Sequence, residues 1–151
     1  MTIDDNFGAD YASARTLFMD AAQACASKTF SYPHAQPGPQ GAPLAIDIAW
    51  LGPADATGVV IAGSGTHGAE GLCGSGCQVG LLREDLKKTL PADVALVLVH
   101  ANNPFGFAHL RRVNEDNVDL NRNFEFLWGL CGSSTSSSSN TYLTTIFNPK
   151  T

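Results

Sequence analysis

The chain of 151 residues is long enough for one domain with its own core. Its composition, with 44% hydrophobic and 15% charged residues, is typical of a globular protein and excludes a disordered one. A net charge of -5 argues against nucleic acid or an anionic membrane as a partner. No apolar run reaches the roughly 18 to 20 residues that cross a membrane, and no signal peptide is apparent. We therefore expect a soluble cytoplasmic protein, whose four cysteines without a Cys-x-x-Cys pair fit reduced thiols.

The first half of the chain predicts one helix and several strands. In residues 7–27 apolar side chains recur at helical spacing, which predicts an amphipathic helix packed on a sheet. Residues 33–43 are dense in proline and glycine, which marks a turn flanked by strands. Residues 44–50 and 59–62 are predicted strands, and the apolar run of the second is typical of a buried one.

A βαβ unit is predicted around the middle of the chain. Residues 72–82 predict a helix, and its glycines indicate close packing because each lowers helix propensity by about 1 kcal/mol relative to Ala. Within this helix we expect Cys73 and Cys77 to be core residues, since burial explains them more simply than metal binding. Residues 94–99 are an unbroken apolar run, typical of a parallel strand covered on both faces. Residues 102–106 then have the composition of a turn.

Residues 63–71 have the sequence GSGTHGAEG and leave the carboxyl end of a predicted strand, where open α/β sheets bind ligands. His67 and Glu70 are the side chains of this loop that carry chemistry. An imidazole nitrogen and a carboxylate suit Zn²⁺, so we interpret the pair as half of a metal site, with a hydrogen-bonded loop pair as the alternative. His100 and His109 are open to two interpretations, as further ligands or general bases or as polar contacts.

The same loop also satisfies the pattern Gly-x-Gly-x-x-Gly through Gly63, Gly65 and Gly68, between a strand and a helix. A dinucleotide-binding loop further expects an acidic residue at the end of the next strand, to hold the ribose. That strand is followed by the sequence HAN instead. Nucleotide binding therefore stays as an alternative that the sequence disfavours.

Residues 111–124 are densely polar and are a candidate carboxylate site. Arginine offers a fork of donors that matches a carboxylate, and asparagine adds a directional amide donor. The donors in this segment are Arg111, Arg112, Arg122, Asn114, Asn117, Asn121 and Asn123. The alternative is a solvated loop in which Glu115, Asp116 and Asp119 neutralise the arginines.

These motifs together resemble the zinc carboxypeptidase superfamily, and are most similar to its bacterial branch beside the succinylglutamate desuccinylase and aspartoacylase enzymes. The resemblance depends on GTHGAEG, NPFGF, Arg112 and VDLNRNF in this order, and covers residues 7–126. It implies an α/β fold, specifically a three-layer α/β/α sandwich with a mixed, largely parallel sheet. It also implies one catalytic Zn²⁺ and hydrolysis of a peptide or amide bond next to a carboxylate, in a small peptide or acyl-amino acid.

Roles for individual residues follow from the same resemblance. His67 and Glu70 match the first two zinc ligands. Arg112 matches the arginine that polarises the scissile carbonyl and stabilises the oxyanion, with its neighbour Arg111 as the less favoured alternative. Asn121 and Arg122 match the pair that holds the substrate carboxylate.

The chain also departs from the family pattern. The family places its third zinc ligand, a histidine, and its general-base glutamate in the second half of a longer domain, and neither is apparent here. We expect residues 1–127 to be the N-terminal part of such a domain, truncated and inactive alone, and residues 128–151, with their serine tract, to be a flexible tail outside the family pattern. A non-catalytic carboxylate- or anion-binding module is the second hypothesis.

Overall fold

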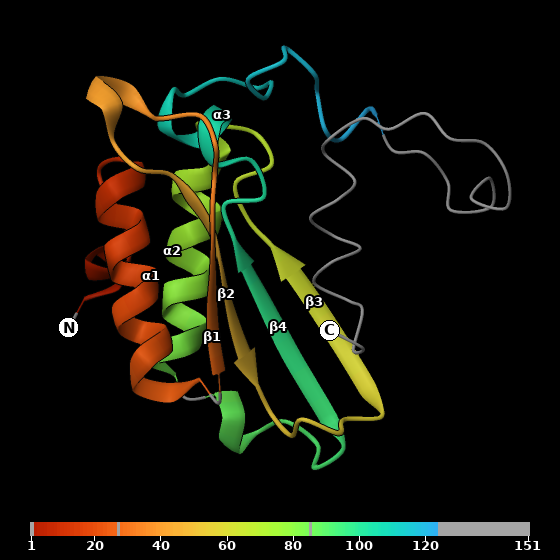
Figure 1. The fold of residues 1–151 in the computed structure, drawn as a ribbon. Coiled ribbons are helices and arrows are strands. Elements are labelled where there is room, and N and C mark those ends of the chain that lie inside the picture. The colour runs from red at the N-terminus through yellow and green to blue at the C-terminus, as the bar shows by residue number, and fades with distance from the viewer. Residues whose placement is uncertain (1, 27, 85, 124–151) are drawn as a thin grey trace, which may run out of the picture.

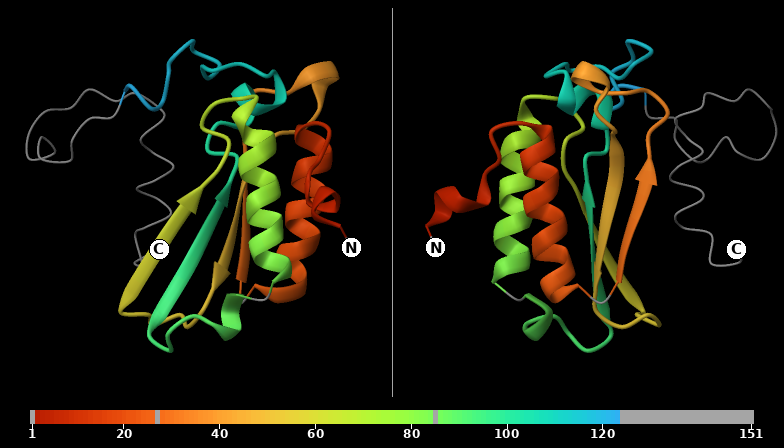
Figure 2. Two further views of the ribbon diagram at one scale, coloured as in Figure 1. Left: turned by 180° about the vertical axis from the view of Figure 1, so that it is seen from behind. Right: turned by 60° about the vertical axis from the view of Figure 1, so that its left-hand side comes forward.

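The computed structural model of the protein describes residues 2–26, 28–84 and 86–123, so the predicted tail lies outside the described residues. The described chain forms one four-stranded sheet with two longer helices packed side by side on one of its faces, as Figures 1 and 2 show. The α-helices are α1 (Tyr11–Cys25), α2 (Glu70–Arg83) and α3 (Pro104–Ala108), and the 3-10 turns are η1 (Ile3–Asn6), η2 (Pro39–Gly41) and η3 (Leu86–Lys88). The strands are β1 (Lys28–Pro33), β2 (Ala45–Leu51), β3 (Gly58–Gly63) and β4 (Val94–His100).

Helix α1 confirms the amphipathic helix predicted near the N-terminus. It begins after Asp10, whose carboxylate accepts a hydrogen bond from the Ser13 backbone N–H at 2.8 Å and so caps the first turn. Its buried face consists of Tyr11, Ala14, Phe18, Ala21 and Ala22. The alanines leave room for α2, so the two helices pack closely against each other.

Two glycines of α2 show close packing of the kind that the sequence predicted, and their neighbours are aromatic rings. A β-carbon on Gly71 would lie 2.8 Å from the ring of Phe107, and one on Gly76 would collide with the ring of Phe7. Both glycines are buried. The helix therefore tolerates residues of low helix propensity because tertiary contacts require them.

The sheet has the order β1-β2-β4-β3 and is mixed, which confirms the α/β class. Strand β2 pairs antiparallel with both β1 and β4, whereas β3 and β4 are parallel. The expectation of a largely parallel sheet is therefore wrong for the described residues, because two of the three pairings are antiparallel. Strands β1 and β2 are joined by a turn at residues 34–44 and not by a helical crossover, which makes them antiparallel, and β2 in turn runs opposite to β4. Helices α1 and α2 both cover the same face, so a third layer remains a prediction (Figure 2).

Strand β3 corrects the expectation of a buried strand. Val59, Val60 and Ile61 are 46%, 55% and 51% exposed. The reason is their place in the sheet: β3 lies at an edge and pairs with β4 alone, whereas β4, between two strands, is buried along nearly its whole length (Figure 1). An apolar run fits an edge strand as well as an interior one, and periodicity does not separate the two.

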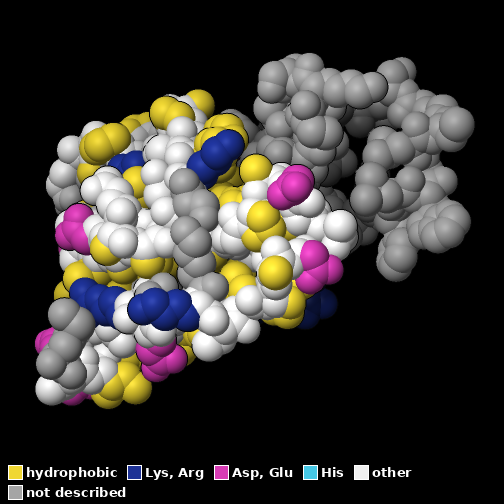
Figure 3. Space-filling model, turned by 90° about the horizontal axis from the view of Figure 1, so that it is seen from below, with side chains coloured by type: hydrophobic (Ala, Val, Ile, Leu, Met, Phe, Trp, Pro, Cys, Tyr) yellow, Lys and Arg dark blue, Asp and Glu magenta, His cyan; other side chains and the backbone are white. Residues whose placement is uncertain are grey.

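The end of the molecule opposite the strand-end loops has a mixed surface. Figure 3 shows basic and acidic side chains interspersed with apolar ones on this face. None of the helices in the described part of the chain is long and apolar enough to cross a membrane.

Two buried polar groups lie side by side under α1. Asp47 interrupts the apolar pattern of β2 and accepts hydrogen bonds from Arg15, at 2.6 Å from Nε and 3.1 Å from Nη2. His100 is its partner in register on β4. The buried His100 ring stacks on Phe18 with centroids 4.8 Å apart, and its Nε2 lies 3.0 Å from the Ser75 hydroxyl.

The environment of His100 makes it a core residue and not a ligand of the predicted site. Its Nδ1 has no hydrogen-bond partner in the described structure. Burial outweighs the attraction of Asp47 and lowers the pKa of His100 to about 4. Of the two interpretations that the sequence left open for this histidine, the structure supports a polar contact.

We predict that His100 makes the fold sensitive to mild acid. Its folded pKa lies below the unfolded value of 6.5, so as the pH falls from 6.5 to 4 the unfolded state takes up the proton first and the free energy of unfolding decreases. The total loss is about 3 kcal/mol over this window. Urea unfolding of wild type and His100→Asn at several pH values measures it, and the variant should lose this dependence on pH.

Ser75→Ala is the matched control for this experiment, because it removes the hydroxyl contact and keeps the titrating ring. It should retain the pH dependence. Equal slopes for wild type and His100→Asn between pH 4 and 6.5 would contradict the assignment.

Candidate functional site

The predicted site loops meet at one end of the sheet because β3 and β4 run parallel. The loop after β3 is fastened to the end of β4 by backbone hydrogen bonds. Ser64 N donates to Val99 O at 2.9 Å, and Asn102 N donates to Ser64 O at 2.8 Å. Gly65 adopts a φ of +67°, a conformation that other residues rarely adopt, where it lies against Ala101.

Gly68 brings the polar segment at residues 111–123 to this loop. Its N–H donates to Arg111 O at 2.9 Å. A β-carbon at this position would collide with Gly106 O and would lie 2.5 Å from Arg111 N, so only glycine allows the two backbones to approach this closely. Two segments more than forty residues apart thus form one site.

The loop amides bear on the nucleotide-binding alternative. A glycine-rich phosphate loop works by pointing free backbone N–H groups at the phosphates. Here the N–H groups of Ser64, Gly68 and Gly71 already donate to carbonyl oxygens of the protein. These three N–H groups are therefore already occupied and do not face a phosphate.

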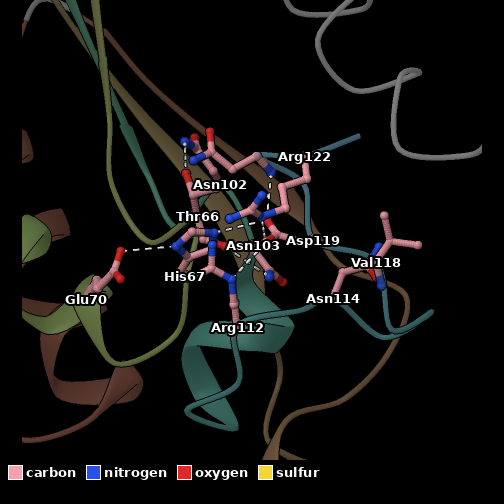
Figure 4. A network of polar contacts seen from close by, with 11 residues as sticks. Thr66, His67, Glu70, Asn102, Asn103, Arg112, Asn114, Val118, Asp119 and Arg122 are labelled. Atoms are coloured by element: carbon pink, nitrogen blue, oxygen red, sulfur yellow. Dashed lines mark hydrogen bonds and ion pairs between the residues drawn. The ribbon is translucent and has the colours of Figure 1, made fainter. Parts of the chain in front are cut away.

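His67 lies at the centre of the site, between Glu70 and Asp119, as Figure 4 shows. Its ring is buried, with Nδ1 3.2 Å from Glu70 Oε2 and Nε2 3.1 Å from Asp119 Oδ1. Glu70, in the first turn of α2, is largely exposed. The two ring nitrogens therefore face two carboxylates of different character, one open to solvent and one mostly buried.

Asp119 joins the histidine to the arginines. Its Oδ2 accepts a hydrogen bond from Arg112 Nε at 2.8 Å and lies 3.5 Å from Arg122 Nε, and its Oδ1 also accepts from Asn121 N at 3.0 Å. Desolvation raises the pKa of Asp119, but hydrogen bonds from His67 and Arg112 outweigh it and hold this pKa at about 2. The carboxylate is therefore ionised at neutral pH.

The sequence pointed to Asp119 only as a neutraliser of the arginines. It does pair with Arg112 and Arg122, as the loop alternative expected, yet it also contacts His67. A carboxylate on the second ring nitrogen of a metal-binding histidine is a common arrangement. That rule, applied to the motif VDLNR, is the signal that could have identified Asp119.

The residues predicted to act on the substrate differ in how they are held. The Arg112 side chain is 53% exposed and lines a pocket of about 200 Å³ together with His67, Glu70 and Leu110. The Arg122 side chain is 79% exposed, and within the described part of the chain its guanidinium has only the longer contact to Asp119. Asn121 is exposed, and its backbone N–H, not a side-chain amide, contacts Asp119.

Two of the asparagines have structural roles. The Asn114 side-chain oxygen accepts hydrogen bonds from the backbone of Asp116 at 3.1 Å and of Val118 at 2.8 Å, which closes a turn. Asn117 occupies this turn with a φ of +63°, a conformation that asparagine tolerates. The structure therefore accounts for these two asparagines by the turn.

The geometry of His67 and Glu70 fits a zinc ion. Two donors bound to one tetrahedral zinc at the usual bond lengths lie about 3.3 Å apart. The separation of 3.2 Å between His67 Nδ1 and Glu70 Oε2 is close to this value. It is also the distance of a direct hydrogen bond, so it fits both interpretations of the pair, and the pocket lies beside both side chains. In the residues that the structure describes, no group of three or more His, Cys, Asp or Glu side chains gathers as a metal site.

The remaining histidines lie in other contacts. His34 Nε2 is 3.2 Å from Glu115 Oε1, which ties the turn before β2 to the polar segment. The ring of His109 lies tilted against that of Phe105, with ring centroids 4.3 Å apart. Together with the buried His100, they leave His67 as the histidine of the candidate site.

Fold and site together define the class: an α/β protein with a two-donor candidate metal site between its strand-end loops. Residues 7–149 match the family described as "Protein of unknown function (DUF2817)", and the chain belongs to this family. No curated protein matches the chain.

Gly68 provides a test of how the site is assembled. We predict that Gly68→Ala lowers the free energy of unfolding by about 1–3 kcal/mol, because its β-carbon forces two backbones apart. Gly58→Ala is the matched control, since its β-carbon would lie in ordinary contact, 3.5 Å from Val94 Cγ2. Urea unfolding compares the two, and equal stability of both variants would contradict the close approach.

Proposed function

We propose that the chain carries part of the active site of a zinc-dependent hydrolase that cleaves a peptide or amide bond next to a carboxylate. The observation that carries this proposal is the 3.2 Å separation of His67 Nδ1 and Glu70 Oε2 beside a pocket that Arg112 also lines. The resemblance to zinc carboxypeptidases adds the reaction class. The substrate we propose is a small peptide or acyl-amino acid, and the compartment we propose is the cytoplasm.

Each side chain has a defined task in this proposal. His67 and Glu70 hold Zn²⁺, which when bound supplies the Lewis acidity that hydrolysis of an amide requires. Arg112 presents donors at the pocket to the oxygen on which charge develops. Arg122, with Asn121 beside it, binds the substrate carboxylate, because a guanidinium matches a carboxylate with two parallel hydrogen bonds.

Asp119 acts as a positioning residue. Its contact with His67 Nε2 fixes the ring so that Nδ1 faces Glu70 and the pocket. A hydrogen bond that the second ring nitrogen donates to a carboxylate also makes the imidazole a better ligand. The same carboxylate holds Arg112, so one side chain aligns the metal donor and the oxyanion donor together.

The ligand set sets a limit on the activity of this chain. Catalytic zinc sites normally use three protein ligands and one open position. Two ligands hold the ion weakly, so we propose that the chain alone binds zinc weakly and turns over little or no substrate.

Zinc titration tests the proposal. In a chain with Cys73→Ser and Cys77→Ser, which removes the exposed thiols of α2 as competing zinc ligands, we expect calorimetry to detect one Zn²⁺ bound through His67 and Glu70. We expect His67→Ala and Glu70→Gln, made in this background, each to abolish this binding. His109→Ala, which removes an imidazole outside the pocket, should leave it unchanged. Zinc binding that survives His67→Ala would overturn the site. Stoichiometric zinc retained after dialysis, with hydrolysis of an acyl-amino acid, would instead overturn the limit on activity.

Asp119 has its own prediction. Asp119→Asn should weaken zinc binding about 10- to 100-fold, the usual effect of losing the carboxylate behind a metal-binding histidine. Asp116→Asn, an exposed acidic residue of the same segment, controls for charge. An unchanged zinc affinity in Asp119→Asn would show that Asp119 does not position His67.

The second candidate is a binding module without catalysis, and the exposure of Arg122 favours it. It predicts that an acyl-amino acid binds equally well with zinc and with a chelator. In both functions Arg122→Glu should abolish binding, but only the hydrolase makes binding depend on zinc. Metal dependence of the affinity therefore separates the two.

A further inference from the structure

Two cysteines of α2 lie where the sequence did not place them. We expected Cys73 and Cys77 in the core, yet both are exposed. The reason is the orientation of the helix: its buried face consists of Gly71, Ser75, Gly76, Gln78, Val79 and Leu82, and the two cysteines fall outside it. Burial therefore does not explain them.

The two thiols are neighbours on the surface. Residues four apart in a helix lie on the same side, one turn from each other. Desolvation raises the pKa of the Cys77 thiol, and the Cys73 thiol raises it further by its charge and a hydrogen bond, so the two sulfur atoms interact. The raised pKa keeps the Cys77 thiol protonated at neutral pH in the free protein. Both cysteines are accessible to solvent.

Helix geometry favours a bridging ion over a disulfide. The β-carbons of residues four apart are about 5–6 Å from each other, whereas a disulfide requires about 3.5–4.5 Å. A disulfide would therefore distort α2. An ion bound to two thiolates at about 2.3 Å each spans a sulfur separation of about 4 Å without moving the backbone.

We propose that Cys73 and Cys77 form a bidentate thiolate site for a thiophilic metal ion, separate from the site at His67 and Glu70. Thiolate sulfur selects soft and borderline ions such as Cu(I), Zn²⁺ and Cd²⁺ over Mg²⁺ and Ca²⁺. Binding replaces the two thiol protons by the ion and releases them to solvent. Water completes the coordination on the exposed side of the helix.

Cadmium is the probe that tests this site, because its thiolate complexes absorb in the near ultraviolet. The full chain with Cys131→Ser, which removes the thiol outside the described residues, should bind one Cd²⁺ with a charge-transfer band and release about two protons. Cys73→Ser and Cys77→Ser should each remove the band and weaken cadmium binding at least about tenfold, because the second thiolate binds intramolecularly. Magnesium should not compete.

Two further variants make the result decisive. Cys25→Ser removes a cysteine of α1 and should leave the band and the affinity unchanged. His67→Ala should also leave them unchanged, which separates this site from the proposed zinc site. The proposal would be overturned if the band survived in the double variant Cys73→Ser/Cys77→Ser. It would also be overturned if His67→Ala lost the band, or if the parent chain bound no cadmium.

Discussion

The parallel pairing of β3 with β4 is the constraint on which the site depends. It brings the carboxyl ends of both strands, and the loops that leave them, to the same edge of the sheet. Hydrogen bonds from Ser64 to Val99 and from Asn102 to Ser64 then fix the loops relative to each other. Without this pairing, His67 would have no fixed relation to the polar segment that supplies Asp119.

Glycine extends this constraint to the polar segment. Because Gly68 has no side chain, the backbone of Arg111 comes within hydrogen-bond distance of it. The next residue, Arg112, therefore reaches the pocket beside His67. The backbone contact between Gly68 and Arg111 thus determines where the Arg112 side chain lies in the candidate site.

The sequence predicted most of the elements and the residues that meet at the site, and its errors have physical causes. The helix and strand periods identified α1, α2, β2 and β4, because these elements bury one face or both. The same signal failed for Val60 and for Cys73, since exposure depends on position in the sheet or on the helix and not on composition. The second role of Asp119 was missed because its partner His67 is distant in sequence and only the fold makes the contact.

Asp119 reconciles two interpretations of the polar segment that the sequence set against each other. An acidic residue that only neutralised arginines would have no reason to contact a buried imidazole, yet Asp119 binds His67 and both arginines. It holds Arg112 closely, at 2.8 Å, and Arg122 more loosely, at 3.5 Å. The fixed guanidinium of Arg112 at the pocket suits charge that develops on one oxygen. The exposed and loosely held guanidinium of Arg122 can instead turn to bind a carboxylate. Because Asp119 contacts Arg112 more closely than Arg122, the two arginines can have the different roles that we propose for them.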